Sequence, residues 1–301
     1  MLFRSFKTEG LSVNFVRFDS AARMVAPLAT GQLDIGGGAP SAGLYNAFAR
    51  GIDIRIVADK GSSPPGFGFA PLMIRKDLVD SGRFKTFADM KGLKLAIQAP
   101  GSGAGPILNE AAKKGGVKWT DFEKAYMPYA QQVAAMANKA LDGGIVAEPT
   151  ASEAERKGIA VRIAGSDVIY PYQEIAAILF AGKFIRERRD VAHKFMRAYI
   201  RGARDYNDAF DDAGKLTGAR GEEIVAILVA STEIKDPAIH RGIVPNGLNP
   251  DGRNNLQSLR ADLDFFRSVG DLEGNVKIED VVDDSFAEAV VKELGPYVKK
   301  K

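Results

Sequence analysis

One stretch of the sequence occurs twice, and this repeat constrains the fold more than any other feature. Ala26–Pro40 reads APLATGQLDIGGGAP, and Ala134–Pro149 reads AAMANKALDGGIVAEP. Each copy indicates a helix end, a turn, a short strand of small residues, and a proline suited to the first turn of a new helix. Because ligands bind at the carboxyl edge of strands in open α/β sheets, two such units predict two similar lobes with a cleft between them. A chance match of common residues is the alternative at this stage.

Length, charge and cysteine content exclude several classes of protein. The 301 residues are enough for about two domains. Net charge is only +3 and the one obvious basic run is the terminal Lys299–Lys301, so no nucleic-acid partner is indicated. No apolar stretch is long enough to span a membrane. The chain has no cysteine, which excludes disulfides and thiol chemistry and fits an oxidising compartment.

Apolar periodicity and turn residues predict alternating strands and helices up to about residue 180, and a mainly helical remainder. Alternation of this kind favours right-handed crossovers and a parallel sheet in each lobe. The extended runs Phe67–Ile74 and Glu174–Phe180 are expected to link the lobes. Lobe one would then hold residues 1–73 and 181–301, and lobe two residues 74–180. Strands are predicted at residues 11–18, 33–37, 52–58, 93–99, 123–127, 159–164 and 174–180, and helices after the second crossover at 190–210, 222–231, 251–269 and 285–294.

Two glycine-rich turns each join a strand to a helix and are candidate binding sites. Bare N–H groups and the helix dipole at such a turn suit an anion, and small residues allow close approach. The spacing matches neither a dinucleotide fingerprint nor a phosphate-binding P-loop. A plain tight turn or close helix–sheet packing is the alternative for both. The candidate residues are Gly37, Gly38, Ala39, Pro40 and Ser41 in the first turn, and Gly101, Ser102 and Gly103 in the second.

Further candidates lie at other predicted strand ends. Ser62 and Ser63 could donate hydroxyl hydrogen bonds, or belong to a solvated loop. Glu148 could receive a ligand ammonium or ring N–H, or cap its own helix. Tyr126 and Tyr172 could form flat walls of a cleft, although single aromatic residues usually belong to a core. The motifs of zinc proteases and serine hydrolases are missing, so we predict no catalytic residue, metal ligand or cofactor.

Phrases spread over the whole chain together resemble one known family. They are FKTEGLSVNFVRF, APLATGQLDIGGGAPS, RGIDIRIVADKG, MIRKDLVDSG, DMKGLKLAIQAPGSG, ALDGGIVAEP and KFMRAYIRGARDY. In this order they are similar to substrate-binding proteins of ABC importers, from the nitrate/sulfonate/taurine group that also covers binders of thiamine-pyrimidine precursors. The resemblance implies a type II periplasmic binding protein fold of class α/β. Each lobe would be a doubly wound sheet flanked by helices, and two hinge strands would join the lobes.

The resemblance also implies a function and a set of partners. The protein would be a monomer that closes on a small anionic or polar organic molecule (a sulfonate, nitrate, a carboxylate or a pyrimidine) and delivers it to an ABC permease. Its compartment would be periplasmic or extracytoplasmic, although no export signal is recognised at the start. Family ligand positions map to Gly38–Ser41, Ser62-Ser63, Gly101–Gly103 and Glu148.

Two alternatives remain open beside transport. One is an enzyme on the same fold, such as a pyrimidine synthase of thiamine biosynthesis, whose cysteine-rich motif this chain lacks. The other is a ligand-sensing domain. The family's first strand and the ligand loop after it have no counterpart here. We therefore predict a defective or refilled sheet beside Leu33–Gly37.

Overall fold

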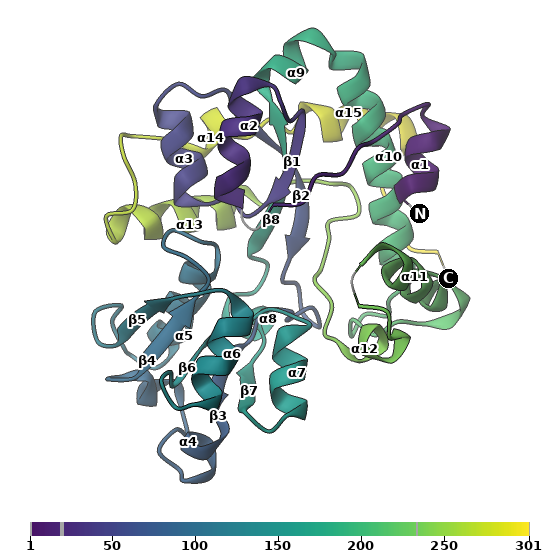
Figure 1. Ribbon diagram of the computed structural model, residues 1–301. Coiled ribbons are helices and arrows are strands. Elements are labelled where there is room, and N and C mark those ends of the chain that lie inside the picture. The colour runs from purple at the N-terminus through teal and green to yellow at the C-terminus, as the bar shows by residue number, and fades with distance from the viewer. Residues whose placement is uncertain (1, 19–20, 233, 301) are drawn as a thin grey trace.

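A computed structural model describes residues 2–18, 21–232 and 234–300. Two α/β lobes lie one above the other, joined by crossing chain segments, and the described ends of the chain lie on the same side of the upper lobe (Figure 1). In chain order the first part contains α1 (Leu2–Thr8), η1 (Ala21–Met24), α2 (Val25–Thr30), β1 (Ile35–Gly38), α3 (Ala42–Ala49) and β2 (Ile54–Ser62). The lower lobe contains β3 (Leu72–Arg75), α4 (Lys76–Asp80), η2 (Phe87–Met90), β4 (Lys94–Ile97), α5 (Ala104–Lys114), β5 (Glu123–Tyr126), α6 (Tyr129–Ala137), β6 (Gly143–Ile145), α7 (Thr150–Arg156), β7 (Ala160–Ala164) and α8 (Ser166–Ile169).

The chain then returns to the upper lobe. Strand β8 (Glu174–Ala181) is followed by helices only, as the sequence predicts for this part. They are α9 (Gly182–Glu187), α10 (Arg189–Asn207), α11 (Gly218–Ser231), α12 (Pro237–Gly242), α13 (Leu256–Ser268), α14 (Ile278–Val281) and α15 (Ser285–Leu294).

The sheet of lobe one has the order β1-β8-β2 among the described residues, and β8 runs antiparallel to both neighbours. In lobe two the order is β5-β4-β6-β3-β7, with β4 parallel to β5 and β6, and β3 antiparallel to β6 and β7. The expectation of wholly parallel sheets is therefore wrong. In each lobe a strand entering from the other lobe, β8 or β3, inserts antiparallel between strands that helices connect.

Strand pairing also moves the predicted return crossover. All of β8, from Glu174 onward, pairs within the sheet of lobe one, so the chain crosses back before Glu174 rather than at 180/181. The apolar run at residues 174–180 did not reveal that the crossover precedes it, because a strand inserted in the centre of a sheet and a strand that links two lobes have the same apolar composition.

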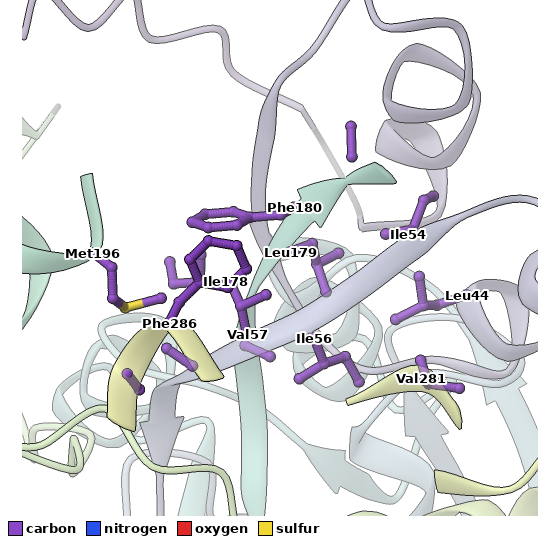
Figure 2. Packing of buried hydrophobic residues seen from close by; sticks show 14 of the residues in the cluster. Leu44, Ile54, Ile56, Val57, Ile178, Leu179, Phe180, Met196, Val281 and Phe286 are labelled. Carbon is purple, nitrogen blue, oxygen red and sulfur yellow. The ribbon is translucent and has the colours of Figure 1, made fainter. Parts of the chain in front are cut away.

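The core of lobe one is built from segments far apart in the sequence. Ile56 and Val57 of β2 and Leu179 and Phe180 of β8 are buried against Phe286 of α15. Met196 of α10 and Val281 of α14 close the same cluster, as Figure 2 shows. Burying each such side chain contributes about 1.5–3 kcal/mol. The helical tail thus packs mainly on lobe one, as expected.

Residues 11–18 do not form the predicted strand. They run as an extended segment between α1 and the helices that precede β1 (Figure 1). Among the described residues, strand β1 pairs with β8 and with no other strand. The segment and β1 both line a cavity of about 790 Å³. Alternating apolar residues form a strand only with a partner strand within hydrogen-bonding distance. The expectation of a defective or refilled sheet beside Leu33–Gly37 stays a prediction.

Candidate functional site

The two glycine-rich turns named from the sequence meet at the junction of the lobes. The backbone N–H of Ala42, the first residue of α3, donates to the carbonyl of Gly101 at 3.0 Å. Gly101 has φ +63°, and a Cβ there would lie 2.7 Å from the Cβ of Ala42. Both the positive φ and the close contact with Ala42 require glycine at position 101. A Cβ on Gly103 would lie 3.7 Å from that of Ala39, so the turns touch along their length.

The helix N-termini at this junction differ in how they are capped. The Ser41 side chain accepts from Leu44 N at 3.3 Å, the usual N-cap contact. Helix α5 begins after Gly103 with no capping side chain. The nearby hydroxyl of Ser102 is buried without a hydrogen-bond partner among the described residues. An uncapped helix start beside an unused hydroxyl offers donors to a small anion.

A small cavity of about 70 Å³ lies against this start of α5. Gly101, Ser102 and Tyr126 line it from lobe two, and Asp271 lines it from the tail of lobe one. Burial raises the pKa of Tyr126, and the nearby Asp271 carboxylate adds to the effect. Its remaining lining residues are Ile97, Gly105, Trp119, Phe265, Phe266 and Val269. Sequence reasoning missed Asp271, Trp119 and Phe265, because nothing in the sequence indicates that the tail comes back to α5.

A buried polar cluster joins the start of β8 to α13, and the sequence did not predict it. Gln173 Nε2 donates to Asp262 Oδ2 at 2.9 Å and to the Gly103 carbonyl at 3.1 Å. The Ser258 hydroxyl accepts from Glu174 N at 3.0 Å. Burial raises the pKa of Asp262 to about 7. It also raises the pKa of Glu174, with the charge of Asp59 as the next cause. These contacts tie both lobes to the crossover.

Ser62 and Ser63 lie at the first crossover, between β2 and β3, where both side chains make hydrogen bonds within the protein. Ser62 Oγ donates to Asp59 Oδ2 at 3.1 Å, and Ser63 Oγ donates to Ser166 Oγ at 2.9 Å. Asp59 also accepts from Asn249 N, at 2.6 Å. The hydrogen bonds lower the pKa of Asp59, but burial raises it by more, so that the pKa is about 6. Both hydroxyls are thus engaged within the protein.

Glu148 lies at the end of β6 in a dense set of contacts. Its carboxylate accepts from Ser152 N at 3.1 Å and from Ser152 Oγ at 3.0 Å, so it caps the start of α7. It pairs with Arg162, whose side chain is 18% exposed against 3% for that of Glu148. It also accepts from Val244 N of the lobe-one tail at 3.4 Å. The carboxylate therefore bridges the lobes as well as capping its helix.

The remaining candidates lie apart from the junction of the two turns. The Tyr172 side chain is 57% exposed with φ +60°, and its carbonyl accepts from Asn255 Nδ2 at 2.7 Å. Gly37 faces the large cavity of lobe one, where a Cβ would approach Lys60. The junction thus brings together Ala39, Pro40, Ser41, Gly101, Ser102, Gly103 and Tyr126. Gly38 packs against Ala21 and Met24 within lobe one, and Gly37, Ser62, Ser63, Glu148 and Tyr172 also lie apart from the junction.

The described part of the chain lacks two features common in other kinds of protein, a cluster of metal ligands and a membrane-spanning helix. No group of three or more His, Cys, Asp or Glu side chains there could hold a metal ion. None of the described helices combines the length and apolar character needed to cross a bilayer.

Two lobes with a shared junction define the bilobed α/β fold of periplasmic binding proteins, and comparison with known families places the chain in one family of that fold. Residues 5–212 match the family model described as NMT1/THI5 like, so the chain belongs to this family. A protein of Escherichia coli (strain K12) described as aliphatic sulfonates-binding is 27% identical over 228 residues. That match covers 75% of this chain and 64% of the relative, somewhat less than two thirds of its length.

Solved structures confirm the fold class. The nitrate-binding protein NrtA from Synechocystis PCC 6803 gives a TM-score of 0.76 at 13% identity, covering 97% of this chain and 84% of that one. The alkanesulfonate-binding protein SsuA from Xanthomonas axonopodis pv. citri, bound to MOPS, gives 0.69 at 19% identity, covering 94% and 90%. The same fold also includes an enzyme, since the desulfurization enzyme DszB matches with a TM-score of 0.63 at 12% identity, covering 96% of this chain and 93% of the enzyme.

Proposed function

We propose that this protein is the solute-binding component of an ABC importer for sulfonate- or nitrate-like anions, working outside the cytoplasm. The observation that carries the proposal is the convergence of two helix starts, those of α3 and α5, on one junction between the lobes. Helix N-termini are suited to anions. The similar proteins that bind aliphatic sulfonates and nitrate take the same class of ligand.

The anionic head group would bind at the start of α5. Ser102 Oγ and the first N–H groups of α5 would donate to it, with Tyr126 as a wall. Gly38–Ser41 would close over it from lobe one, where the Ala42–Gly101 hydrogen bond now joins the two turns. Room for a larger substituent requires that contact to open. The site therefore couples ligand entry to movement of the lobes.

Hinge closure would be controlled by the contacts that cross between the lobes. Glu148 bonded to Val244 N, and Gln173 bonded to both Gly103 and Asp262, each hold one lobe to the other. A ligand that touches both turns would add to these contacts only in the closed state. Such differential binding is what shifts an open–closed equilibrium. Ser62, Ser63 and Tyr172 would contribute to the walls of the opened cleft.

A thermal-shift screen tests the ligand class directly. The full chain is heated with alkanesulfonates, MOPS, nitrate, aromatic acids or pyrimidines. A true ligand at a hundred times its Kd stabilises the folded state by about 2.7 kcal/mol, which raises the Tm by several degrees. The shift should disappear in Ser102→Ala and persist in Ser81→Ala, an exposed serine of the same lobe. A screen in which no compound raises the Tm would contradict the proposal.

Catalysis on this fold is the competing function, because DszB shares the fold. The chain has no cysteine, so a thiol nucleophile is excluded. We propose that the protein binds and releases its ligand unchanged. Incubation of each stabilising compound with the protein, followed by mass spectrometry, should return the compound intact; a converted product would favour the enzyme.

A further inference from the structure

The small cavity at the start of α5 is lined by one carboxylate, and that carboxylate comes from the other lobe. Asp271 lies in the loop that joins α13 to α14 in lobe one, and it shares the cavity with Gly101 and Ser102 of lobe two. Figure 1 shows α13 next to α5 across the junction. No lysine, arginine or histidine among the described residues lines this cavity. The charge of Asp271 therefore has no cation beside it there.

One side chain of α3 holds the loop of Asp271 in place. Asn46 donates from Nδ2 to the carbonyl of Asp271 at 2.9 Å, and its Oδ1 accepts from the N–H of Glu273 at 2.8 Å. Glu273 also pairs with Arg50, the residue that follows α3. The N–H of Asp271 donates to the carbonyl of Phe266 at 2.9 Å. These hydrogen bonds fix the loop to α3, so the carboxylate moves with lobe one.

The carboxylate of Asp271 makes a contact that an anionic ligand would make. Burial raises the pKa of Asp271 above its usual value, and a hydrogen bond from the N–H of Gly101 opposes this shift. Desolvation raises the pKa of Tyr126, and the charge of Asp271 adds to the effect. A carboxylate resembles a sulfonate or nitrate in carrying one negative charge on oxygens that accept from backbone N–H groups. Asp271 thus offers the turn before α5 the same chemistry as the proposed ligand.

The contact between Asp271 and Gly101 also joins the two lobes. The N–H of Gly101 donates to Asp271, and the carbonyl of Gly101 accepts from the N–H of Ala42 at 3.0 Å. Both backbone groups of this lobe-two residue are therefore bonded to lobe one, to α3 and to the loop that α3 holds. A ligand that takes the Gly101 N–H must break the first of these bonds and can keep the second.

We propose that Asp271 is an internal competitor of the anionic ligand, which holds the lobes together by taking the place of the head group at the start of α5. The inference rests on the proposed function, because it concerns the regulation of the same site. An anion that enters beside Asp271 meets a like charge, so binding requires the carboxylate to withdraw. The apparent affinity is then the intrinsic affinity multiplied by the fraction of molecules in which the donors are free.

Protonation of Asp271 should end the competition, because a neutral carboxyl group does not repel an anion. Tyr126 faces it from β5 and is uncharged below its own raised pKa. The charged groups on the other neighbouring elements form ion pairs of their own, Arg50 with Glu273 and Arg267 with Asp264. Sulfonates and nitrate stay ionised at mildly acidic pH. The affinity for them should therefore rise as the pH falls toward the raised pKa of Asp271.

Titration calorimetry of the full chain with methanesulfonate and with nitrate tests the competition. At pH 8, Asp271→Asn and Asp271→Ala should each bind the anion at least about tenfold more tightly than the wild type, since the competitor is removed. Asp264→Asn, which changes an exposed carboxylate of α13, should leave the affinity unchanged. The ratio between variants and wild type should shrink from pH 8 to pH 5. Asp59 and Asp262 also titrate in this range, but they are present in every protein compared.

The amide resonance of Gly101 gives a second readout, which does not depend on affinity. In the ligand-free wild type its NMR chemical shift should follow the protonation of Asp271 as the pH changes. That dependence should disappear in Asp271→Ala, and in the wild type when nitrate saturates the site. A Gly101 resonance that ignores the protonation of Asp271 would overturn the proposal.

The affinities separate a failure of this inference from a failure of the proposed function. If the wild type binds an anion and both Asp271 variants bind it equally or more weakly, Asp271 is not a competitor and the proposed function stands. If neither the wild type nor the variants bind any anion, the proposed function fails, and the competitor fails with it.

Discussion

The two copies of the repeat adopt the same local structure and occupy opposite positions in their sheets. Strand β1, from the first copy, lies at an edge with one neighbour, whereas β6 lies between β4 and β3. A Cβ on Gly37 would meet only the flexible end of Lys60, at 3.0 Å. A Cβ on Gly144 would lie 2.4 Å from the carbonyl oxygen of Ala96. The same small-residue pattern leaves space in one lobe and permits close backbone packing in the other.

The copies also differ in how charge is compensated near the strand ends. Glu148, after β6, is neutralised by Arg162 and by hydrogen bonds from Ser152. Close to the turn after β1, Asp262 is buried with no cation and relies on neutral donors. The charge near the end of β6 is therefore compensated by an ion pair, while that near the turn after β1 depends on protonation. Four predictions test these differences between the two copies.

Arg162→Met should have the largest effect. It leaves the buried Glu148 carboxylate without its cation, which typically costs about 3–5 kcal/mol of folding free energy. Glu148→Gln should cost less, because Arg162 retains Glu155 at 3.2 Å. From the sequence Glu148 is either a ligand contact or a helix cap, and its contacts now lead us to expect lower stability in Glu148→Gln. Urea unfolding of both variants measures these losses. Equal stability of Arg162→Met and wild type would show that the Arg162–Glu148 ion pair does not stabilise the protein.

Gly144→Ala should come next, with a loss of about 3 kcal/mol, since the new methyl group collides with backbone that cannot move aside. The variant Gly37→Ala, in the strand of the first copy, should change stability by less than about 1 kcal/mol, because the Lys60 side chain can shift. Thermal unfolding of the pair provides the measurement. If both substitutions lower the free energy of unfolding equally, the packing around the edge strand β1 and the central strand β6 would not differ as described.

Asp262→Asn should stabilise the protein by about 2 kcal/mol at pH 8. The difference between the folded and unfolded pKa values of Asp262 sets an upper limit of about 4 kcal/mol for this gain. The folded state keeps the Asp262 proton up to a pKa of about 7, whereas the unfolded chain loses it near the ordinary value of 3.8. Wild-type stability therefore falls as the pH rises from about 4 to 7. Asparagine does not titrate, so the advantage of the variant should vanish at pH 4. Denaturation series at both pH values check the sign, and an advantage independent of pH would contradict the assignment.

Ser41→Ala should have the smallest effect, a loss of about 1 kcal/mol from the missing N-cap of α3. If Ser41 also contacts the ligand, affinity should fall by more than the stability change explains. Ser41→Asp, which can still cap, should restore stability and weaken anion binding through repulsion. Recovery of both properties in Ser41→Asp would limit the residue to capping.

Local order was predictable because its causes are local. Capping residues, glycines and apolar periodicity predicted the order of helices and strands, and a local pattern of this kind, the capping box of Thr86 and Asp89, begins η2. The turns at Gly38–Ser41 and Gly101–Gly103 could each be recognised from their place between a strand and a helix, whereas their contact between the lobes could not. Asp271 and Asp262 were not predictable as site residues, because they enter through a tail whose path no local pattern records.

The sequence by itself determined the repeat, the α/β class, the family, and the two glycine-rich turns as candidate sites. Only the tertiary structure decided that β8 inserts antiparallel, that residues 11–18 form no strand, and that the two turns meet between the lobes. The physical reason is that a helix satisfies its hydrogen bonds within itself, so its sequence suffices to predict it. A strand depends on a neighbour that is distant in the chain, and among the described residues β1 has such a neighbour on one side.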